Sequence, residues 1–188
     1  MTPKIRITRE QIIAAAVEIV RRDGDAALNA RSVAAELRCS TQPVFSNFAA
    51  MDELRQAVIA AAWEKCVGYV EREVAGGQHP PYKASGMAYI RFAMEETELF
   101  KLLYMRSRKK DEVSPEAGLF GDMQNLVQQN TGVNADLAKL FHLEMWTYVH
   151  GIAAMIATGY LTLDWELISR MLTDAYQGLK KQYEQEEM

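Results

Sequence analysis

Cysteine and histidine are scarce in this chain of 188 residues, which holds two cysteines and three histidines. Neither Cys39 nor Cys66 has a Cys or His partner at the spacing of a metal site. No metal and no cofactor are therefore expected. The two thiols could form a single disulfide, but we favour two buried thiols that are not bonded to each other.

The chain also lacks any apolar run long enough to cross a membrane, because no stretch approaches about 18 consecutive apolar residues. Its charged N-terminus lacks the apolar segment and the small-residue cleavage site of a signal peptide. We therefore expect a cytoplasmic protein without a membrane partner. Proline and glycine are few, with five and 11 residues, and their clustering suits long helices with short breaks.

Positive charge is in short supply over most of the chain, whose formal net charge is −4. That balance argues against a strongly basic nucleic-acid-binding protein. Residues 1–51, however, hold seven Lys and Arg against five acids, a balance of +2 that leaves −6 for the remainder. This distribution fits DNA binding confined to the first part, although a solvated helix face can show the same bias by chance.

Apolar residues recur at helical spacing along the whole chain, and no sustained alternation or hairpin turn favours a strand. At the first helix, Thr8 followed by Gln11 has the spacing of a capping box, and Gly24 ends the segment. The pattern predicts an all-α fold of about nine helices. The expected helices cover approximately residues 8–24, 29–38, 41–48, 51–76, 82–96, 98–108, 115–130, 134–158 and 164–184.

Residues 29–48, with the sequence NARSVAAELRCSTQPVFSNF, contain two short helical patterns separated by a polar turn. In a helix-turn-helix the two helices cross closely, and Ala34 provides the small residue that the crossing needs. The turn position four residues on, which tends towards a left-handed backbone, holds Arg38 rather than glycine, at a cost of about 1 kcal/mol. Val44 is expected to pack back onto Ala34 and Leu37. Two helices arranged in this way can present the second one to a groove of DNA.

The packing of Val44 leaves the polar side of the second short helix facing outward. Thr and Gln side chains there can read base edges, and Phe45 can contact a thymine methyl. At the start of the first short helix, backbone N–H groups beside Asn29 can hold a phosphate. Three core helices without any role at DNA are the alternative interpretation of this region. The predicted DNA-binding residues are Lys4, Arg6, Asn29, Ala30, Arg31, Thr41, Gln42, Pro43, Phe45, Ser46 and Asn47.

Residues 5–54 resemble the N-terminal domain of the TetR family of bacterial transcriptional regulators. The resemblance rests on the segments ITREQIIAAAVEIV, LNARSVAAEL and STQPVFSNFAAMDEL, whose spacing agrees with the family across three helices. It implies three DNA-binding helices followed by a larger helical domain that binds a ligand and forms a dimer. We accordingly expect a DNA-binding domain at residues 1–51 and a ligand-binding and dimerisation domain at residues 52–188.

The chain departs from the family pattern at three positions. Arg38 replaces the usual glycine, Asn47 stands where Tyr or His is common, and Met51 stands where Lys is common. The family residues at the last two positions often touch phosphate; Asn47 can still do so, whereas Met51 cannot. Affinity for the DNA backbone is then expected from four other cations, namely Lys4, Arg6, Arg9 and Arg31.

The C-terminal part is rich in Met and aromatic residues at helical spacing, most of which must belong to an ordinary core. Methionine also suits sites that bind varied apolar ligands. The segment MWTYVHGIAAMIATGYL resembles a Trp-x-x-x-His-Gly pattern of one class of TetR C-terminal domains, with Trp146 and His150 on one helix face. His150 is then either the polar anchor of a pocket wall or a satisfied core or interface histidine. The predicted pocket residues are Phe92, Tyr104, Met105, Phe120, Met123, Trp146 and His150.

The resemblance also implies a homodimer through the eighth and ninth helices, which are the usual dimer elements of the family. Small residues in this part of the chain suit close helix packing. They are Gly151, Ala153, Ala154, Ala157 and Gly159.

No Ser-His-Asp order, Gly-rich phosphate loop or metal motif occurs, and the acids Glu95, Glu96 and Glu98 are interpreted as a solvated helix face. We therefore expect no catalytic residues and no enzyme activity. The sequence predicts a homodimeric repressor that binds a palindromic operator in double-stranded DNA and is released by a small apolar effector. A ligand-responsive activator and a helical binding protein without a DNA function are the alternatives.

Overall fold

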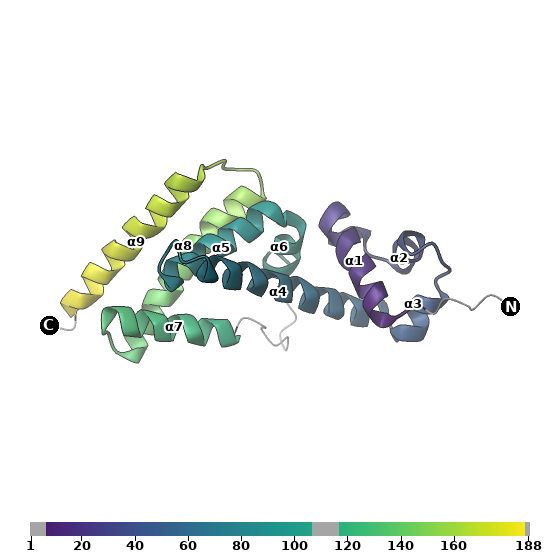
Figure 1. The fold of residues 1–188 in the computed structure, drawn as a ribbon, viewed down its shortest axis with the longest axis horizontal. Helices are drawn as coiled ribbons and strands as arrows, with labels where there is room; N and C mark the ends of the chain where they lie inside the picture. The colour runs from purple at the N-terminus through teal and green to yellow at the C-terminus, as the bar shows by residue number, and fades with distance from the viewer. Residues whose placement is uncertain (1–6, 107–116, 187–188) are drawn as a thin grey trace. The chain divides into compact units, whose positions relative to one another are not determined.

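The computed structural model describes residues 7–106 and 117–186, with the backbone alone for Ala117, Gly118, Phe120, Gln185 and Glu186 (Figure 1). Within these residues the fold is all-α, as predicted, with nine α-helices, one short 3-10 helix and no strand. The elements are α1 (Arg9–Asp23), η1 (Asp25–Ala27), α2 (Ala30–Glu36), α3 (Gln42–Asn47), α4 (Met51–Ala75), α5 (Pro81–Glu95), α6 (Thr97–Tyr104), α7 (Ala117–Thr131), α8 (Ala135–Ala157) and α9 (Trp165–Glu186).

Local signals set the ends of the first helices. The Thr8 side chain accepts a hydrogen bond from the Gln11 N–H at 3.3 Å, and the Gln11 side chain accepts one from the Thr8 N–H at 2.9 Å. These two bonds complete the predicted capping box of α1. Gly24 ends α1 with a φ of 82°, and Asn29 caps α2 by accepting two backbone N–H groups.

The chain folds into two compact units, which we call the head and the body. The head comprises Met1–Lys65 with Glu96–Ser107, and the body comprises Cys66–Glu95 with Arg108–Met188. The long helix α4 therefore begins in the head and ends in the body. Helix α6 lies in the head, although α5 before it and α7 after it lie in the body. A boundary of the DNA-binding domain at residue 51 stays a prediction.

The core of the head lies where α1 packs against α2, α6 and η1 (Figure 1). Ile12, Ala16 and Val20 follow one another at intervals of one helical turn along α1, and all three are fully buried. Val44 of α3 and Leu54 of α4 are also fully buried. Because helices as short as α2 and α3 are not stable alone, this shared core is what holds them in place.

The core of the body lies among α5, α7, α8 and α9. Tyr82, Val127, Phe141, Met145 and Tyr183 come from these four helices, and each is buried. The rings of Tyr82 and Phe141 meet edge to face, with centres 6.5 Å apart. Many of the aromatic residues of this part therefore belong to an ordinary core.

No helix among residues 7–106 and 117–186 is both long and apolar enough to span a membrane. The same residues contain no cluster of three or more His, Cys, Asp or Glu side chains that could hold a metal ion. Cys39 and Cys66 form no disulfide; Cys66 is buried and Cys39 is half-buried.

Candidate functional site

Helices α2 and α3 pack across a tight turn in the head. Val44 is fully buried and Ala34 is 5% exposed, and this burial agrees with the contact predicted between them. The turn contains Arg38 with a φ of 52°, and among the described residues no other residue except glycine has a positive φ. The Cys39 N–H donates to the Ala34 carbonyl at 2.9 Å and closes the turn. Because the chain turns here, α2 ends at Glu36, earlier than predicted.

The outward face of α3 carries the residues predicted to read DNA bases. Gln42 and Ser46 are exposed, Thr41 is half-buried at the start of the helix, and the Phe45 side chain is 56% exposed. A large aromatic side chain in this position contributes little to the core and offers a contact surface. The Ser46 hydroxyl donates to the Gln42 carbonyl at 2.9 Å, which leaves its oxygen as an acceptor. Pro43 lies in the first turn of α3, where its missing N–H is tolerated.

Two exposed cations belong to α2 and to the turn that follows it. Arg31 and Arg38 are exposed, and neither forms an ion pair with any residue that the structure describes. The Asn29 side chain accepts the N–H groups of Arg31 and Ser32, both at 3.0 Å, so these two donors are already used. Ala30, the first residue of α2, is half-buried. The charge available to a phosphate near α2 therefore comes from the two arginines.

Lys4 and Arg6, also predicted to contact DNA, lie outside the described residues.

Arg9 and Asn47, both expected to contact phosphate, make contacts within the head. The Asn47 Nδ2 donates to the Pro43 carbonyl at 2.8 Å. Arg9 donates from Nη1 to the Asn47 carbonyl at 2.6 Å and from Nη2 to Glu53 at 2.9 Å. Its guanidinium carbon lies 4.0 Å from the centre of the Phe48 ring. Arg9 is thus engaged between α1, the end of α3 and the start of α4.

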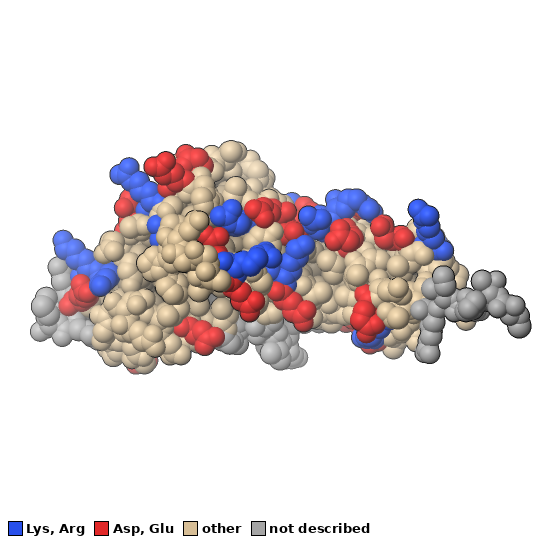
Figure 2. Space-filling view, viewed as in Figure 1, with Lys and Arg blue, Asp and Glu red and all other residues tan. Residues whose placement is uncertain are grey.

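Charges of both signs are interspersed on the face of the molecule shown in Figure 2, where Lys and Arg lie beside Asp and Glu. Ion pairs in the head agree with this view: Arg22 contacts Asp23 at 2.8 Å and Glu36 at 3.3 Å. Mixed charges of this kind produce a weak long-range field.

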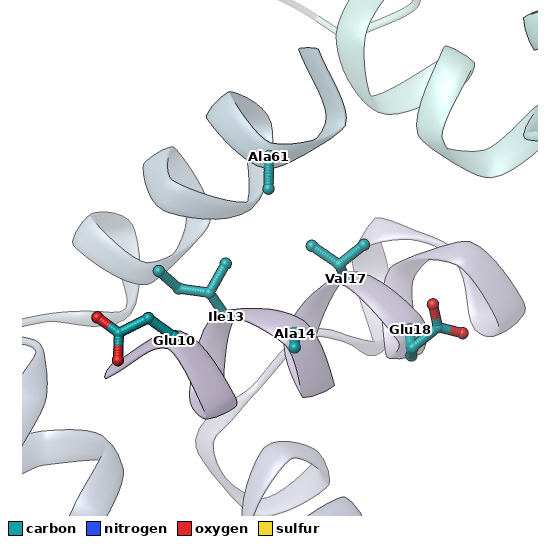
Figure 3. A pocket seen from close by; sticks show the side chains of 6 residues that line it. All are labelled: Glu10, Ile13, Ala14, Val17, Glu18 and Ala61. Carbon is teal, nitrogen blue, oxygen red and sulfur yellow. The ribbon is translucent and has the colours of Figure 1, made fainter. Parts of the chain in front are cut away.

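An open hollow of 410 Å³ lies on the head between α1 and α4 (Figure 3). Its apolar floor comes from α1 and from Ala61 of α4, and Glu10 and Glu18 stand at its two ends. Its lining residues are Glu10, Ile13, Ala14, Val17, Glu18 and Ala61, none of which belongs to the predicted ligand pocket. Because it is open, it lacks the enclosure that a small-molecule site requires.

Two of the predicted pocket residues meet in the body. Trp146 and His150 stack on α8 with ring centres 5.1 Å apart. The Tyr89 hydroxyl, which the sequence did not single out, lies 2.8 Å from Nδ1 of His150 in a hydrogen bond. Burial lowers the pKa of His150 below its ordinary value, so the ring is neutral at neutral pH. These three side chains form a partly polar, aromatic cluster between α5 and α8.

The other predicted pocket residues are divided between the head and the body. Phe92 is fully buried, and Met123 packs against the body core. Tyr104 and Met105 belong to the head, and Met105 is 45% exposed. The side chain of Phe120 lies outside the described residues. A pocket formed by all seven residues stays a prediction.

The sequence did not indicate that two polar side chains are buried: Glu96 is 4% exposed and His142 is 6% exposed. Glu96 pairs with Arg21 at 2.7 Å and with Lys65 at 2.9 Å, so its interpretation as part of a solvated face is wrong. Nδ1 of His142 lies 3.0 Å from the Tyr82 hydroxyl. The partners lie as far as 75 residues away, and no local spacing signals them.

One face of α8 exposes large apolar side chains. They are Leu140, Leu143, Tyr148 and Met155, with exposed fractions of 45%, 49%, 39% and 39%. At 3.6 residues per turn they fall on one side of the helix, and we call them the α8 stripe. Gly151 falls on the same side, and a Cβ there would meet open space. Ala153 and Ala157, expected at a dimer surface, are instead buried inside the body.

A family profile described as Tetracyclin repressor-like, C-terminal domain, matches residues 82–176, about half of the chain. The HTH-type nicotine-responsive transcriptional repressor HdnoR of Paenarthrobacter nicotinovorans is 36% identical over 70 residues, which cover 37% of this chain and 36% of that protein. The chain thus matches about a third of the length of that relative.

Two solved structures resemble the fold. A protein of unknown function from Rhodococcus sp. RHA1 has a TM-score of 0.73 at 21% identity, covering 97% of this chain and 99% of that one. A member of the TetR family from Streptomyces coelicolor A3 has a TM-score of 0.63 at 21% identity, covering 89% and 96%. At this level of identity the likeness concerns the fold alone.

Proposed function

The chain belongs to the TetR family of bacterial transcriptional regulators, and from this membership we propose that it is a DNA-binding repressor released by a small effector. The observation that carries the proposal is the outward face of α3. Gln42, Phe45 and Ser46 are exposed on a helix of six residues that α2 supports through a tight turn. In a helix-turn-helix, a face of this kind enters the major groove.

The side chains of this face suit the reading of base edges. Gln42 can bond to adenine in two places, and Thr41 can bond to several bases. The Phe45 ring can contact a thymine methyl group. Arg31 and Arg38 stand beside them as cations for phosphates, which set the register of a protein on DNA but carry no sequence information. Such binding weakens as salt concentration rises.

A two-fold homodimer binding a palindromic operator is the second part of the proposal. One head reads too few bases to select a site in a genome, whereas two heads reading half-sites double the contacts. The α8 stripe supports an interface at α8 and α9, because large apolar side chains exposed together on a helix mark an interaction surface. On α9, Leu167 is a further large apolar side chain that is 41% exposed.

The third part is release by a small apolar effector that enters the body. The cluster of Tyr89, Trp146 and His150 combines aromatic surface with hydrogen-bonding atoms, as ligand sites do. An effector need only bind the DNA-incompetent conformation more tightly, by a few kcal/mol, to shift the protein away from its operator. The relative from Paenarthrobacter nicotinovorans is a nicotine-responsive repressor, and by analogy we infer that this chain also responds to a small molecule. Such a regulator would act in the cytoplasm, where bacterial DNA is found.

A mobility-shift assay on DNA upstream of the protein's own gene tests this function. Sequence-specific, salt-sensitive binding is expected, and Thr41→Ala with Gln42→Ala should weaken it about tenfold or more. Gln128→Ala with Gln129→Ala, two exposed substitutions on α7, is the matched control. Equal affinity of the wild-type protein for upstream and unrelated DNA would contradict the proposal. Deletion of the gene should raise expression of a reporter behind the bound DNA, and a fall would indicate an activator.

A further inference from the structure

We propose that Arg9 and Glu53 together fix the orientation of α3, so that both determine DNA specificity without contacting DNA. This inference rests on the proposed function, because α3 is the helix taken to read the operator. It differs from the sequence-based expectation, which assigns Arg9 to the phosphate backbone. It also gives an acidic residue a favourable effect on binding to a polyanion, which simple electrostatics would not predict.

The Arg9 guanidinium is occupied on three sides. Nη1 donates to the backbone carbonyl of Asn47, the last residue of α3, at 2.6 Å. Nη2 donates to Oε1 of Glu53, in the first turn of α4, at 2.9 Å. Its flat face lies over the Phe48 ring, which is 2% exposed. A planar group with several fixed donors is suited to such a junction, and here it joins α1 to the end of α3 and the start of α4.

Glu53 completes the junction with its second oxygen. Oε2 accepts the N–H of Ala49, in the segment between α3 and α4, at 2.8 Å. The bond from Ala49, followed by the bond from Arg9, holds the pKa of Glu53 below its ordinary value. The carboxylate therefore stays ionised and ties the arginine to the segment that follows α3.

Helix α3 depends on such contacts because it is too short to hold its own direction. It has six residues, one of which, Val44, is buried, and Thr41 makes no side-chain cap bond at its start. Val44, together with Phe48 one residue beyond the helix, sets how deeply the helix sits, but neither apolar side chain can donate a hydrogen bond to the carbonyl at the end of α3 that Arg9 binds. The bond from Arg9 to the Asn47 carbonyl fixes the opposite end, and with it the direction in which Gln42 and Phe45 face.

The same contacts should contribute little to the stability of the head. The Arg9 and Glu53 side chains are 41% and 44% exposed, and ion pairs in such positions add little to the free energy of unfolding. Without them the head is expected to stay folded while α3 samples several orientations. Base contacts along α3 then weaken together, whereas phosphate contacts from Arg31 and Arg38 persist.

Glu53→Gln separates this proposal from simple electrostatics. Removing a negative charge near DNA should strengthen binding or leave it unchanged if charge alone matters. We expect the opposite: affinity for the operator falls about tenfold, while affinity for unrelated DNA and the melting temperature stay close to wild type. Glu10→Gln is the matched control, because Glu10 adjoins Arg9 and its carboxylate is held by its own backbone and Thr8.

Arg9→Met tests the other half of the junction through salt dependence. Loss of a phosphate contact reduces the slope of log affinity against log salt concentration by about 1. We expect a lower operator affinity with an unchanged slope. The losses in Arg9→Met and Glu53→Gln should also fail to add in the double variant, since both remove the same junction.

Several outcomes would overturn the proposal. They are an operator affinity that rises or holds in Glu53→Gln, a reduced salt slope in Arg9→Met, and equal losses on operator and unrelated DNA. Glu53→Asp keeps the charge but is too short to reach both Arg9 and Ala49, so it covers the case in which Glu53→Gln fails to fold. An unchanged operator affinity in Glu53→Asp also overturns the proposal. If the wild-type protein shows no sequence-specific binding to DNA, the proposed function is refuted instead. Binding by the wild-type protein is therefore measured before binding by any variant.

Discussion

At the scale of single residues, Arg38 in the turn between α2 and α3 has a backbone conformation that residues other than glycine rarely adopt. Its φ of 52° belongs to the left-handed region, where a residue other than glycine costs about 1 kcal/mol. Its guanidinium is exposed and pairs with no acid among the described residues. The same residue therefore strains the backbone and supplies a cation beside α3, which agrees with a role in contact rather than in packing.

His142 is a second residue whose surroundings decide its properties. Its ring lies 5.9 Å from the Tyr82 ring, and Nδ1 is bonded to the Tyr82 hydroxyl. Burial lowers the pKa of His142 to about 4, because a charged imidazolium would lose its hydration inside the body. The folded protein therefore favours the neutral ring well below the pH at which an exposed histidine becomes charged.

We predict that His142 makes the protein less stable in mild acid. Between its ordinary pKa of 6.5 and about 4, the unfolded chain binds a proton on His142 that the folded chain does not. The contribution of His142 to the free energy of unfolding is constant above pH 6.5 and falls by on the order of 3 kcal/mol as the pH approaches 4. Urea unfolding across this range should show a smaller decline for His142→Leu. His79→Leu, between α4 and α5, is the control, and an equal decline in wild type and His142→Leu would contradict the prediction.

At the scale of elements, Glu96 joins three helices of the head. It precedes α6 and contacts Arg21, near the end of α1, and Lys65 of α4. Because the carboxylate is almost fully buried, the two cations contact it in place of water. The ion triad holds α6 in the head despite its place in the chain between two helices of the body.

Removing both cations of this triad should lower the free energy of unfolding far more than removing either one. Arg21→Met or Lys65→Met leaves one cation and should lower the free energy of unfolding only slightly. The double variant leaves an unpaired buried carboxylate and should lose about 3 to 5 kcal/mol, part of which Glu96→Gln should restore. Glu18→Gln, which removes an exposed partner of Arg21 at 3.6 Å, is the control. Chemical unfolding measures each variant, and strictly additive losses would show that Glu96 does not need the pair.

These elements also show what can be predicted from a sequence. The caps at Thr8 and Asn29 and the left-handed turn at Arg38 could be predicted because their causes lie within four residues of each position. The contacts of Arg9 and Glu96 could not, because their partners lie 44 and 75 residues away. Local periodicity is therefore enough to predict the fold class and the outward face of α3. The contacts of Arg9 and Glu53 at the end of α3, and the membership of α6 in the head, follow from tertiary packing alone.

At the scale of the whole molecule, the α8 stripe and the face of α3 are two exposed surfaces, and the proposed function gives each of them a partner. A stripe of large apolar side chains is costly in water unless it is covered. Under the proposed function, the outward face of one α3 would contact too few bases for specificity. In the proposed homodimer, a second copy of the chain would cover the stripe and supply a second head for the other half-site.

The final prediction follows from this coupling of association and specificity. Leu143→Glu places a charge in the α8 stripe and should produce a folded monomer, because Leu143 is 49% exposed and contributes little to the body core. With one head per molecule, operator affinity should fall about a hundredfold or more, while weak binding to unrelated DNA persists. Sedimentation velocity and mobility shift measure the two effects, and Gln129→Glu, an exposed position on α7, is the control. A Leu143→Glu protein that remains dimeric would place the interface elsewhere. A monomer that binds the operator as tightly as wild type would instead show that one α3 is sufficient for recognition.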